Sequence, residues 1–373
     1  MITIVVPTLN RPAFVVRALE YFAAASFGGE VLVGDSSDGE NAQRTKRAID
    51  RLKPRLRAVH LDCRGMDDRL ALHRLAREVR SRYVAFMGDD DFLIPSGIEQ
   101  CIAFLEREPS FVAANGQAWT FDVRPGDVNG RLRIVESYRQ PELLDDAAHQ
   151  RLDAILADYR VGIFSVHRAE AWKEMWRRAP EALDRSFGAE LLPCCLSAVL
   201  GKTKHLDCFY LLRQKTHAAH YMLPRASDWT ANAHWQSSLD LFCEELSRNV
   251  QSVDGRPGSM PASVVNERFV ELYLKPRFPA YGSHPAGRAP AGNPSGLRRL
   301  AKAIPGVHAA FLSAFRWYWR MRTALRQRRA IMEAVQFSLR MKYPGQKSFE
   351  QVRKDFLVVR EVVRAVPEAR PGP

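Results

Sequence analysis

Several features that would assign this 373-residue sequence to a specialised class are missing. No apolar run approaches the ~20 residues that cross a bilayer as a helix. The six cysteines form no CxxC pair and no framework spacing, so we expect free thiols in a reducing compartment and no zinc site. The first residues, MITIVVPTLNRP, lack a basic region and indicate a β-strand rather than a signal peptide. No internal repeat is visible. These absences favour a cytoplasmic protein.

Acidic residues are scarce in the last third of the chain. Residues 1–230 contain 32 Lys and Arg against 31 Asp and Glu, whereas residues 231–373 contain 23 against 11. Nearly all of the formal net charge of +13 therefore lies in the C-terminal third. An anionic partner would be met by this region and not by the near-neutral remainder. The composition is otherwise that of a globular protein with room for two domains.

A dense group of carboxylates lies between two apolar runs. In residues 83–95, YVAFMGDDDFLIP, a strand ends at Gly88 and is followed by Asp89, Asp90 and Asp91. Neighbouring carboxylates raise one another's pKa unless a cation neutralises them, and clusters of oxygen ligands suit Mg²⁺ or Mn²⁺. A solvated acidic turn is the alternative. The preceding strand favours a binding site, because ligands of open α/β sheets bind at the carboxyl ends of strands.

Strands and helices alternate through the first 90 residues. We expect strands at 2–6, 30–34, 56–61 and 83–87, helices at 13–25, 41–53 and 67–80, and a further helix capped by Ser96 and Glu99. This order predicts an α/β fold with a mostly parallel sheet and helices on both faces. Polar groups follow three of the strands and should gather along one edge of the sheet: Thr8 and Asn10, Asp35, and the aspartate triplet.

Beyond residue 110 the pattern becomes less regular. We expect short strands at 111–114, 118–121, 162–166 and 206–212, and a helix at 167–177. The stretch FGAELLP then places Glu190 in a strongly apolar setting. Glu190 either begins a helix, where the helix dipole favours an acid, or is a general base whose pKa is raised by its surroundings.

The C-terminal region is expected to be helical and basic. Stretches rich in Pro, Gly and Ser at 252–262 and 276–296 indicate linkers around a short helix at 264–274. Residues 296–330 contain nine Lys and Arg, no acid, and an apolar stripe at helical spacing. Such a helix either lies on an anionic membrane surface, at the inner face of the membrane, or packs on its own protein. Both alternatives stay open.

The order of three motifs resembles a known family. IVVPTLNR at the first strand, VGDSS at the second and YVAFMGDDDFL at the fourth are similar to the inverting glycosyltransferases of family 2, which have the GT-A fold. FGAELLP and the following strand with Arg213 are similar to the part of that family that supplies the base. The similarity covers roughly residues 1–215. It implies a GT-A domain at 1–225, with a nucleotide-sugar half (1–122) and an acceptor half (123–225), before a basic region at 226–373.

The resemblance implies a reaction and assigns roles to residues. A sugar would move from a nucleotide-diphosphate sugar to a hydroxyl of a glycan, a lipid-linked saccharide or a cell-surface polysaccharide, with inversion. The triplet matches the DxD motif, which binds ribose and the Mn²⁺ or Mg²⁺ ion that bridges the phosphates. Glu190 matches the carboxylate that deprotonates the acceptor. The implied donor-binding residues are Pro7, Thr8, Asn10, Arg11, Asp35, Arg69, Asp89 and Asp90.

The chain also departs from the family pattern. Gly88 stands where the family commonly has an acid, which leaves the register open: Asp89 and Asp91 form a literal DxD, whereas the flanks favour Asp90 as the metal ligand. Leu191 stands where a second acid often follows the base. His217 and His220 lie where some relatives bring a metal or phosphate ligand, and they are otherwise surface histidines.

Two rival functions were weighed. A phosphatase of the haloacid-dehalogenase kind places its nucleophilic Asp after the first strand, where this chain has Pro-Thr-Leu-Asn. A non-catalytic protein that binds membranes or nucleic acid through the basic region is the alternative from another class. Acids at the strand ends of a near-neutral α/β half argue against binding as the whole function, and a nucleic-acid partner is not expected.

Overall fold

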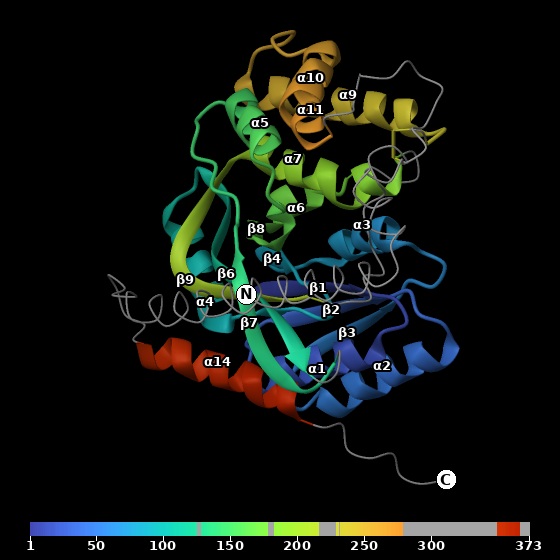
Figure 1. Cartoon of the computed structure of the whole chain (residues 1–373), viewed down its shortest axis with the longest axis vertical. Coiled ribbons are helices and arrows are strands. Elements are labelled where there is room, and N and C mark those ends of the chain that lie inside the picture. Colours follow the sequence, from blue (N-terminus) through green and yellow to red (C-terminus); the bar gives the residue numbers. More distant parts are fainter. Residues whose placement is uncertain (125–127, 178–182, 216–228, 231, 279–348, 366–373) are drawn as a thin grey trace, which may run out of the picture.

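A nine-stranded mixed sheet organises the chain (Figure 1). The structure is a computed structural model that describes residues 1–124, 128–177, 183–215, 229–230, 232–278 and 349–365. The strands run in the order β3-β2-β1-β4-β8-β6-β9-β5, and β7 pairs with β6 outside this path. Most paired residues belong to parallel ladders, so the mostly parallel α/β sheet expected from the sequence is confirmed.

The first half of the sheet is parallel and alternates with helices as predicted. The apolar residues of β1 and β2 are buried on both faces, which is why β-branched residues fill these strands without alternation, whereas Val59 of the edge strand β3 is exposed. Figure 1 shows α1 and α2 on one side of the sheet and α3 on the other. The elements are β1 (Ile2–Thr8), α1 (Pro12–Ala24), β2 (Glu30–Asp35), α2 (Gly39–Leu52), β3 (Arg57–Asp62), α3 (Asp68–Glu78) and β4 (Tyr83–Phe86).

The second half of the sheet is mixed. Here β8 pairs antiparallel with both β4 and β6, and β6 pairs parallel with β9. Gly97 at the start of α4 packs so closely on β9 that a Cβ would lie 2.2 Å from the Phe209 carbonyl oxygen, which excludes a side chain there. The elements are β5 (Phe92–Leu93), α4 (Pro95–Arg107), β6 (Phe111–Arg124), β7 (Arg131–Tyr138), η1 (Gly162–Phe164), β8 (Val166–Arg168) and β9 (Lys202–Gln214).

Three local predictions were wrong. The two strands expected at 111–114 and 118–121 form one continuous strand, β6. The strand expected at 162–166 is a 3₁₀ turn, η1, followed by β8. Ser96 does not cap α4, because Pro95 already occupies the first helical turn and Ile94 is the N-cap residue. The Ser96 hydroxyl instead contacts the Asp355 carboxylate in the C-terminal helix.

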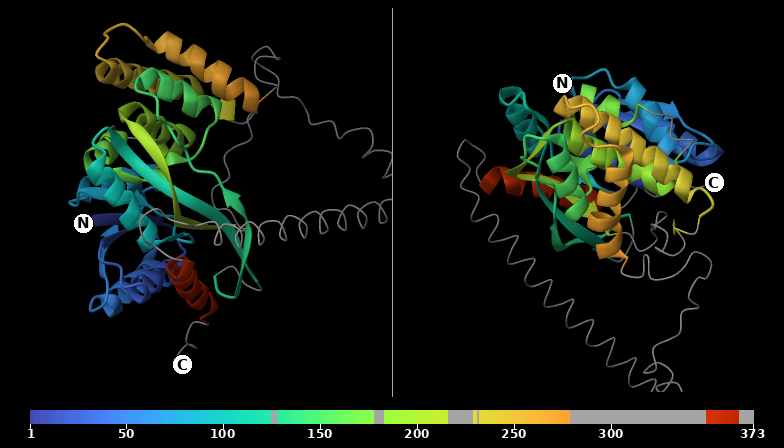
Figure 2. Two further views of the ribbon diagram at one scale, coloured as in Figure 1. Left: turned by 90° about the vertical axis from the view of Figure 1, so that its left-hand side faces the viewer. Right: turned by 90° about the horizontal axis from the view of Figure 1, so that it is seen from above.

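Helices from the rest of the chain cover the sheet. In Figure 1, α6 and α7 lie on the same side of the sheet as α3, whereas α14 lies beside α1. The views of Figure 2 place α9, α10 and α11 beyond α7, at the end of the molecule away from α14. The elements are α5 (Ala148–Ala157), α6 (Ala169–Met175), η3 (Phe187–Leu191), α7 (Leu192–Leu200), α9 (Trp235–Asp254), α10 (Ala262–Arg268), η4 (Phe269–Leu274), α11 (Lys275–Arg277) and α14 (Phe349–Arg364).

The described helices of the C-terminal region share a core with the rest of the chain. α9 packs against α7 and α5, and η4 packs against α5. The first expected linker is shorter than predicted, because α9 continues to Asp254 and α10 begins at Ala262. The second linker, from residue 279 on, and the basic stretch 296–330 lie outside the described residues. The domain boundary near residue 225 stays a prediction.

Two expectations drawn from absences can be compared with the structure. All six cysteines are buried and unpaired, so the expectation of free thiols is confirmed. Within the described part of the chain, no helix combines the length and the apolar character that crossing a bilayer requires.

Candidate active site

The carboxyl ends of the parallel strands meet at one edge of the sheet, as the sequence predicts. Thr8 at the end of β1 is in register with Asp35 at the end of β2, and Asp35 with Asp62 at the end of β3. The aspartate triplet follows β4 and lies beside Thr8, whose hydroxyl donates to Asp89 Oδ2 at 2.8 Å. Thr8 and the triplet border a cleft of about 670 Å³, whereas Asp35 and Asp62 lie outside its lining.

The cleft brings together most of the residues singled out in the sequence. Its lining includes residues from the first loop, the triplet and the π-helical turn η3. Among the predicted site residues, those that line it are Pro7, Thr8, Arg11, Asp89, Asp90, Asp91 and Glu190. Other lining residues were not predicted, among them Asp68 and Arg185, Phe86 and Phe164, and Gln214 and Lys215.

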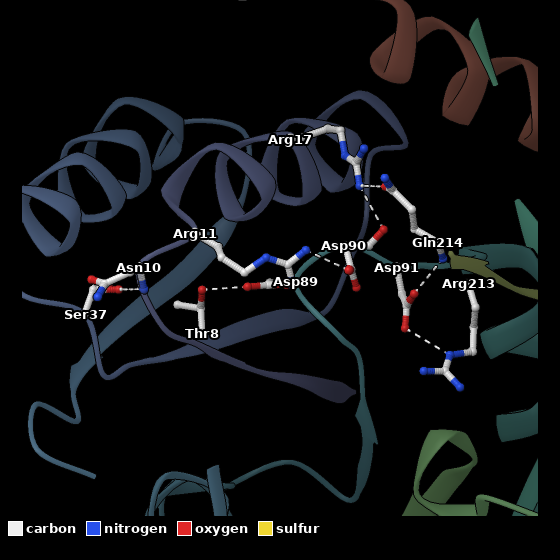
Figure 3. A network of polar contacts seen from close by, with 10 residues as sticks. All are labelled: Thr8, Asn10, Arg11, Arg17, Ser37, Asp89, Asp90, Asp91, Arg213 and Gln214. Carbon is white, nitrogen blue, oxygen red and sulfur yellow. Dashed lines mark hydrogen bonds and ion pairs between the residues drawn. The ribbon is translucent and has the colours of Figure 1, made fainter. Parts of the chain in front are cut away.

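Arg11 bridges two aspartates of the triplet (Figure 3). Its Nη1 lies 2.5 Å from Asp89 Oδ1, and its Nη2 lies 2.8 Å from Asp90 Oδ2. The guanidinium also lies over the Phe14 ring, 4.0 Å from the ring centroid. The first loop therefore supplies a cation directly to the carboxylates, held in place by helix α1. A bound diphosphate would find this cation at the same point.

A second arginine, Arg17 of α1, also contacts the triplet and was not predicted. It is 3% exposed, and its Nη2 donates to the Asp90 carbonyl oxygen at 2.8 Å and to Gln214 Oε1 at 2.7 Å. Burial lowers the pKa of Arg17 to about 10, and the nearby aspartates oppose that fall. No local pattern in the sequence indicates its burial, because its partners lie far along the chain.

Asp91 is fixed by the last strand of the sheet. Its Oδ1 accepts a hydrogen bond of 2.9 Å from the Gln214 backbone N–H, and its Oδ2 lies 3.4 Å from Arg213 Nε. The Arg213 guanidinium is held between two rings, 4.3 Å from the centroid of Phe164 and 4.8 Å from that of Tyr138. Strand β9 thus closes the triplet on the side opposite Arg11 (Figure 3).

Burial disfavours the ionised form of two carboxylates of the triplet. Burial raises the pKa of Asp89 to about 7, with a further rise from Asp90 that Arg11 opposes. Burial likewise raises the pKa of Asp91 to about 6, with Arg213 opposing and Asp90 adding to the rise. Such raised values mark carboxylates that gain from a cation.

The chemistry of this donor set fits a divalent ion shared with a substrate. Among the described residues no three His, Cys, Asp or Glu side chains converge to hold a metal, and within the triplet Asp89 and Asp91 turn to opposite sides (Figure 3). Mg²⁺ and Mn²⁺ commonly bind one or two carboxylates plus substrate phosphates and water, so a three-residue cage is not required. Asp90 has the most exposed side chain of the three, at 16% against 6% and 2%.

Glu190 faces the same cleft from the π-helical turn η3. The Tyr159 hydroxyl donates to Glu190 Oε1 at 3.2 Å. Burial raises the pKa of Glu190, while that hydrogen bond and the positive charges of Arg213 and Arg185 partly offset the rise. This is the setting expected of a carboxylate that accepts a proton. Glu190 also lies in the first turn of η3, which continues directly into α7, so the structure is compatible with both alternatives drawn from the sequence.

Three predicted donor-binding residues lie outside the lining. Asn10 adopts a left-handed conformation with φ 56° and accepts hydrogen bonds from Asp38 and Asn41, so it fixes the loop after β2. Asp35 is fully buried, and hydrogen bonds from His60 and Ser37 outweigh the effect of burial and lower its pKa.

Arg69 is the third. It pairs with Asp67 and contacts the Leu183 carbonyl oxygen, which ties α3 to the segment before η3. Gly188 of η3 lies against Arg69, since a Cβ there would be 3.1 Å from Arg69 Cδ. The two histidines proposed as weaker metal ligands, His217 and His220, lie outside the described residues.

Comparison with known proteins identifies a family match for the first half of the chain. The sequence model described as Glycosyl transferase family 2 matches residues 3–175. A search of curated proteins found no match. Among solved structures, TarS 1-349 of S. aureus in complex with UDP-GlcNAc is 16% identical, with a TM-score of 0.46 over 74% of this chain and 78% of that one.

Two further structures are similar at the same level. Mannosyltransferase PcManGT from Pyrobaculum calidifontis, in complex with GDP-Man and Mn²⁺, is 12% identical with a TM-score of 0.43, over 92% of this chain and 88% of that one. A longer TarS structure is 15% identical with a TM-score of 0.43, over 70% of this chain, which spans 44% of its length. At these TM-scores the structures add nothing to the family match. The match identifies residues 3–175 as a glycosyl transferase family 2 domain.

Proposed function

We propose that this protein transfers a sugar from a nucleotide-diphosphate sugar to a hydroxyl of a glycan, a lipid-linked saccharide or a cell-surface polysaccharide, with inversion of the anomeric carbon. The observation that carries the proposal is the shared cleft. It places the half-buried Glu190 in one lining with the three carboxylates at the strand ends, and those carboxylates lie inside the family 2 match. One group supplies the donor site and the other supplies a base.

The donor would lie along the strand ends with its diphosphate against the triplet. Arg11, which bridges Asp89 and Asp90, is the cation nearest to the phosphates on the β1 side. Arg213 and Lys215 line the cleft on the β9 side. A divalent ion held by Asp90 would act as a Lewis acid on the departing diphosphate. Pro7 and Thr8 line the cleft beside Asp89 and would contact the nucleotide.

Glu190 would take the proton of the acceptor hydroxyl. As that oxygen bonds to the anomeric carbon, the bond from this carbon to the diphosphate breaks and its electron pair leaves with the diphosphate oxygen. A single displacement from the opposite face inverts the anomeric configuration. The aromatic rings of Phe86 and Phe164 line the cleft and would exclude water from part of it once the substrates are bound.

Thermal stability with a panel of UDP-, GDP-, dTDP- and CMP-sugars, with and without Mn²⁺, tests the donor site. Binding to the native state at a hundredfold excess over Kd adds about 2.7 kcal/mol, so we expect a rise in Tm of about 5 °C with one nucleotide. The rise should be larger with Mn²⁺. Folded protein that shows no shift with any donor would contradict the proposal.

On acidification, turnover should fall at a higher pH than an ordinary carboxylate would give. Glu190 works as a base only when ionised, and burial raises its pKa above the ordinary carboxyl value of 4.5, so kcat should fall on acidification at a correspondingly higher pH. Initial rates of nucleoside diphosphate release measure this fall in kcat. The donor and Mn²⁺ are kept saturating, because protonation of the triplet would otherwise weaken donor binding and lower the rate as well. A fall in kcat with its midpoint at the ordinary carboxyl pKa would contradict the role of Glu190.

The basic stretch 296–330 is expected to bind anionic membranes and bring the enzyme to a membrane-bound acceptor. Full-length protein should sediment with vesicles that contain phosphatidylglycerol and not with pure phosphatidylcholine vesicles. Neutralising three cations of the stretch should weaken sedimentation, whereas neutralising three exposed cations of α2 should not. The first set is Arg316, Arg320 and Arg322, and the control set is Arg44, Lys46 and Arg47. Equal sedimentation of both triple variants would contradict a specific role for 296–330.

A further inference from the structure

The turn that carries Glu190 is held by an aromatic cluster from outside the family match. Phe187, in the same turn η3, is fully buried. Its ring centroid lies 5.3 Å from that of Trp235 and 5.1 Å from that of Phe242, both on α9, and 5.9 Å from that of Phe269 at the start of η4. A π-helical turn is uncommon and needs support from its surroundings, which these helices supply.

A second contact reaches Glu190 itself. Tyr159, just after α5, donates its hydroxyl to Glu190 Oε1 at 3.2 Å. The Tyr159 ring packs edge-on against the ring of Tyr273 in η4, with centroids 5.3 Å apart and planes at 87°. The guanidinium carbon of Arg277 in α11 lies 4.3 Å from the Tyr273 centroid and 5.7 Å from the Tyr159 centroid. Arg277 Nη1 also donates to the Leu156 carbonyl oxygen of α5 at 3.3 Å.

We propose that Tyr159, Tyr273 and Arg277 are positioning residues that fix the Glu190 carboxylate, so that η4 and α11 of the C-terminal region set the geometry of the base. The proposal rests on the assigned role of Glu190. Tyr273 and Arg277 act through the Tyr159 ring, and Tyr159 acts through its hydrogen bond. These residues lie close together only because α5 and η4 pack on each other.

The physical effect of this arrangement is on one carboxylate oxygen. The Tyr159 hydroxyl favours the ionised form of Glu190 and holds Oε1, which leaves Oε2 for the proton of the acceptor. The Tyr159 phenol is itself kept protonated, because burial raises its pKa well above the usual value. The titratable and charged groups that bear on Glu190 are Tyr159, Arg213, Arg185, Asp68, Tyr138, Cys194 and Tyr273.

The test follows the titration of Glu190 directly in the full-length protein. Protein labelled with ¹³C at the glutamate side-chain carboxyl is titrated by NMR, and the resonance that disappears in Glu190→Gln is assigned to Glu190. The Tyr159→Phe variant keeps the ring and removes the hydroxyl. We expect its Glu190 midpoint to move to higher pH, with kcat reduced about tenfold and donor KM unchanged.

The contribution of η4 is tested by two matched substitutions of Tyr273. Tyr273→Leu removes the ring that supports Tyr159 and should move the Glu190 midpoint to higher pH. Tyr273→Phe keeps the ring and should leave the midpoint at the wild-type pH. If Tyr273→Leu does not fold, Arg277→Met is used instead, because it is a milder change at a partly exposed position and should also move the Glu190 midpoint to higher pH.

The outcomes separate this inference from the proposed function. An unchanged midpoint in Tyr159→Phe, or in both Tyr273→Leu and Arg277→Met, would overturn the positioning role. Midpoints that move as expected while Glu190→Gln keeps full turnover would confirm that these residues fix Glu190 and would instead refute its role as the base.

Discussion

Sugar transfer should be lost in Glu190→Gln while donor binding is kept. Glutamine has nearly the same shape but cannot accept a proton, so we expect kcat to fall by about 10² to 10⁴, the usual contribution of a general base. The Kd for the donor with Mn²⁺ should stay within a factor of about two, because the donor site lies at the strand ends. Nucleoside diphosphate release measures the first quantity and calorimetry the second.

A matched control separates this effect from a general loss of acid. Glu170 is an exposed glutamate near the start of α6, and Glu170→Gln should keep both turnover and donor affinity. If Glu190→Gln lost donor affinity and turnover to the same extent, Glu190 would be a binding residue rather than the base. Full turnover of Glu190→Gln would show that Glu190 is not the base.

Donor binding should lose its dependence on metal in Asp90→Asn. Asp90 carries the most exposed carboxylate of the triplet, and an amide is a much weaker ligand for Mn²⁺. We expect donor affinity in the presence of Mn²⁺ to fall about a hundredfold, which corresponds to about 2.7 kcal/mol, and affinity without Mn²⁺ to change little. Calorimetric titration with and without Mn²⁺ measures both.

The neighbouring aspartates give the comparison that decides the register of the motif. Asp62→Asn, at the exposed end of β3 on the same sheet edge, is the control and should bind the donor as the wild type does. Asp91→Asn should mainly disturb the contacts with Arg213 and the Gln214 backbone. If instead Asp91→Asn removed the effect of Mn²⁺ and Asp90→Asn did not, the metal ligand would be Asp91.

The sequence predicted the parallel half of the sheet and the gathering of polar strand ends. This succeeded because buried parallel strands are uniformly apolar and their carboxyl ends must meet at one edge, whatever the details of packing. The contact of Thr8 with Asp89 follows from that rule. The apolar run around Glu190 likewise indicated a carboxylate in apolar surroundings, and the structure places it, half-buried, in the cleft.

The positions of Asp35, Arg69 and Arg17 could not be predicted in the same way. Each depends on partners far along the chain: His60 for Asp35, the Leu183 carbonyl for Arg69 and Gln214 for Arg17. A lone arginine in a helix gives no local sign of whether it is buried. The link from Tyr273 through Tyr159 to Glu190 is equally long-range, and no spacing pattern in the sequence indicates it.

The stereochemistry of the product tests the central claim most directly. Wild-type protein is incubated with the donor identified by the stability panel, and the anomeric proton of the first product is observed by ¹H NMR before mutarotation, with transfer to an acceptor or to water. Direct displacement assisted by Glu190 predicts that an α-linked donor yields a β product. An α product would require a second displacement at the anomeric carbon, and it would contradict the assigned mechanism.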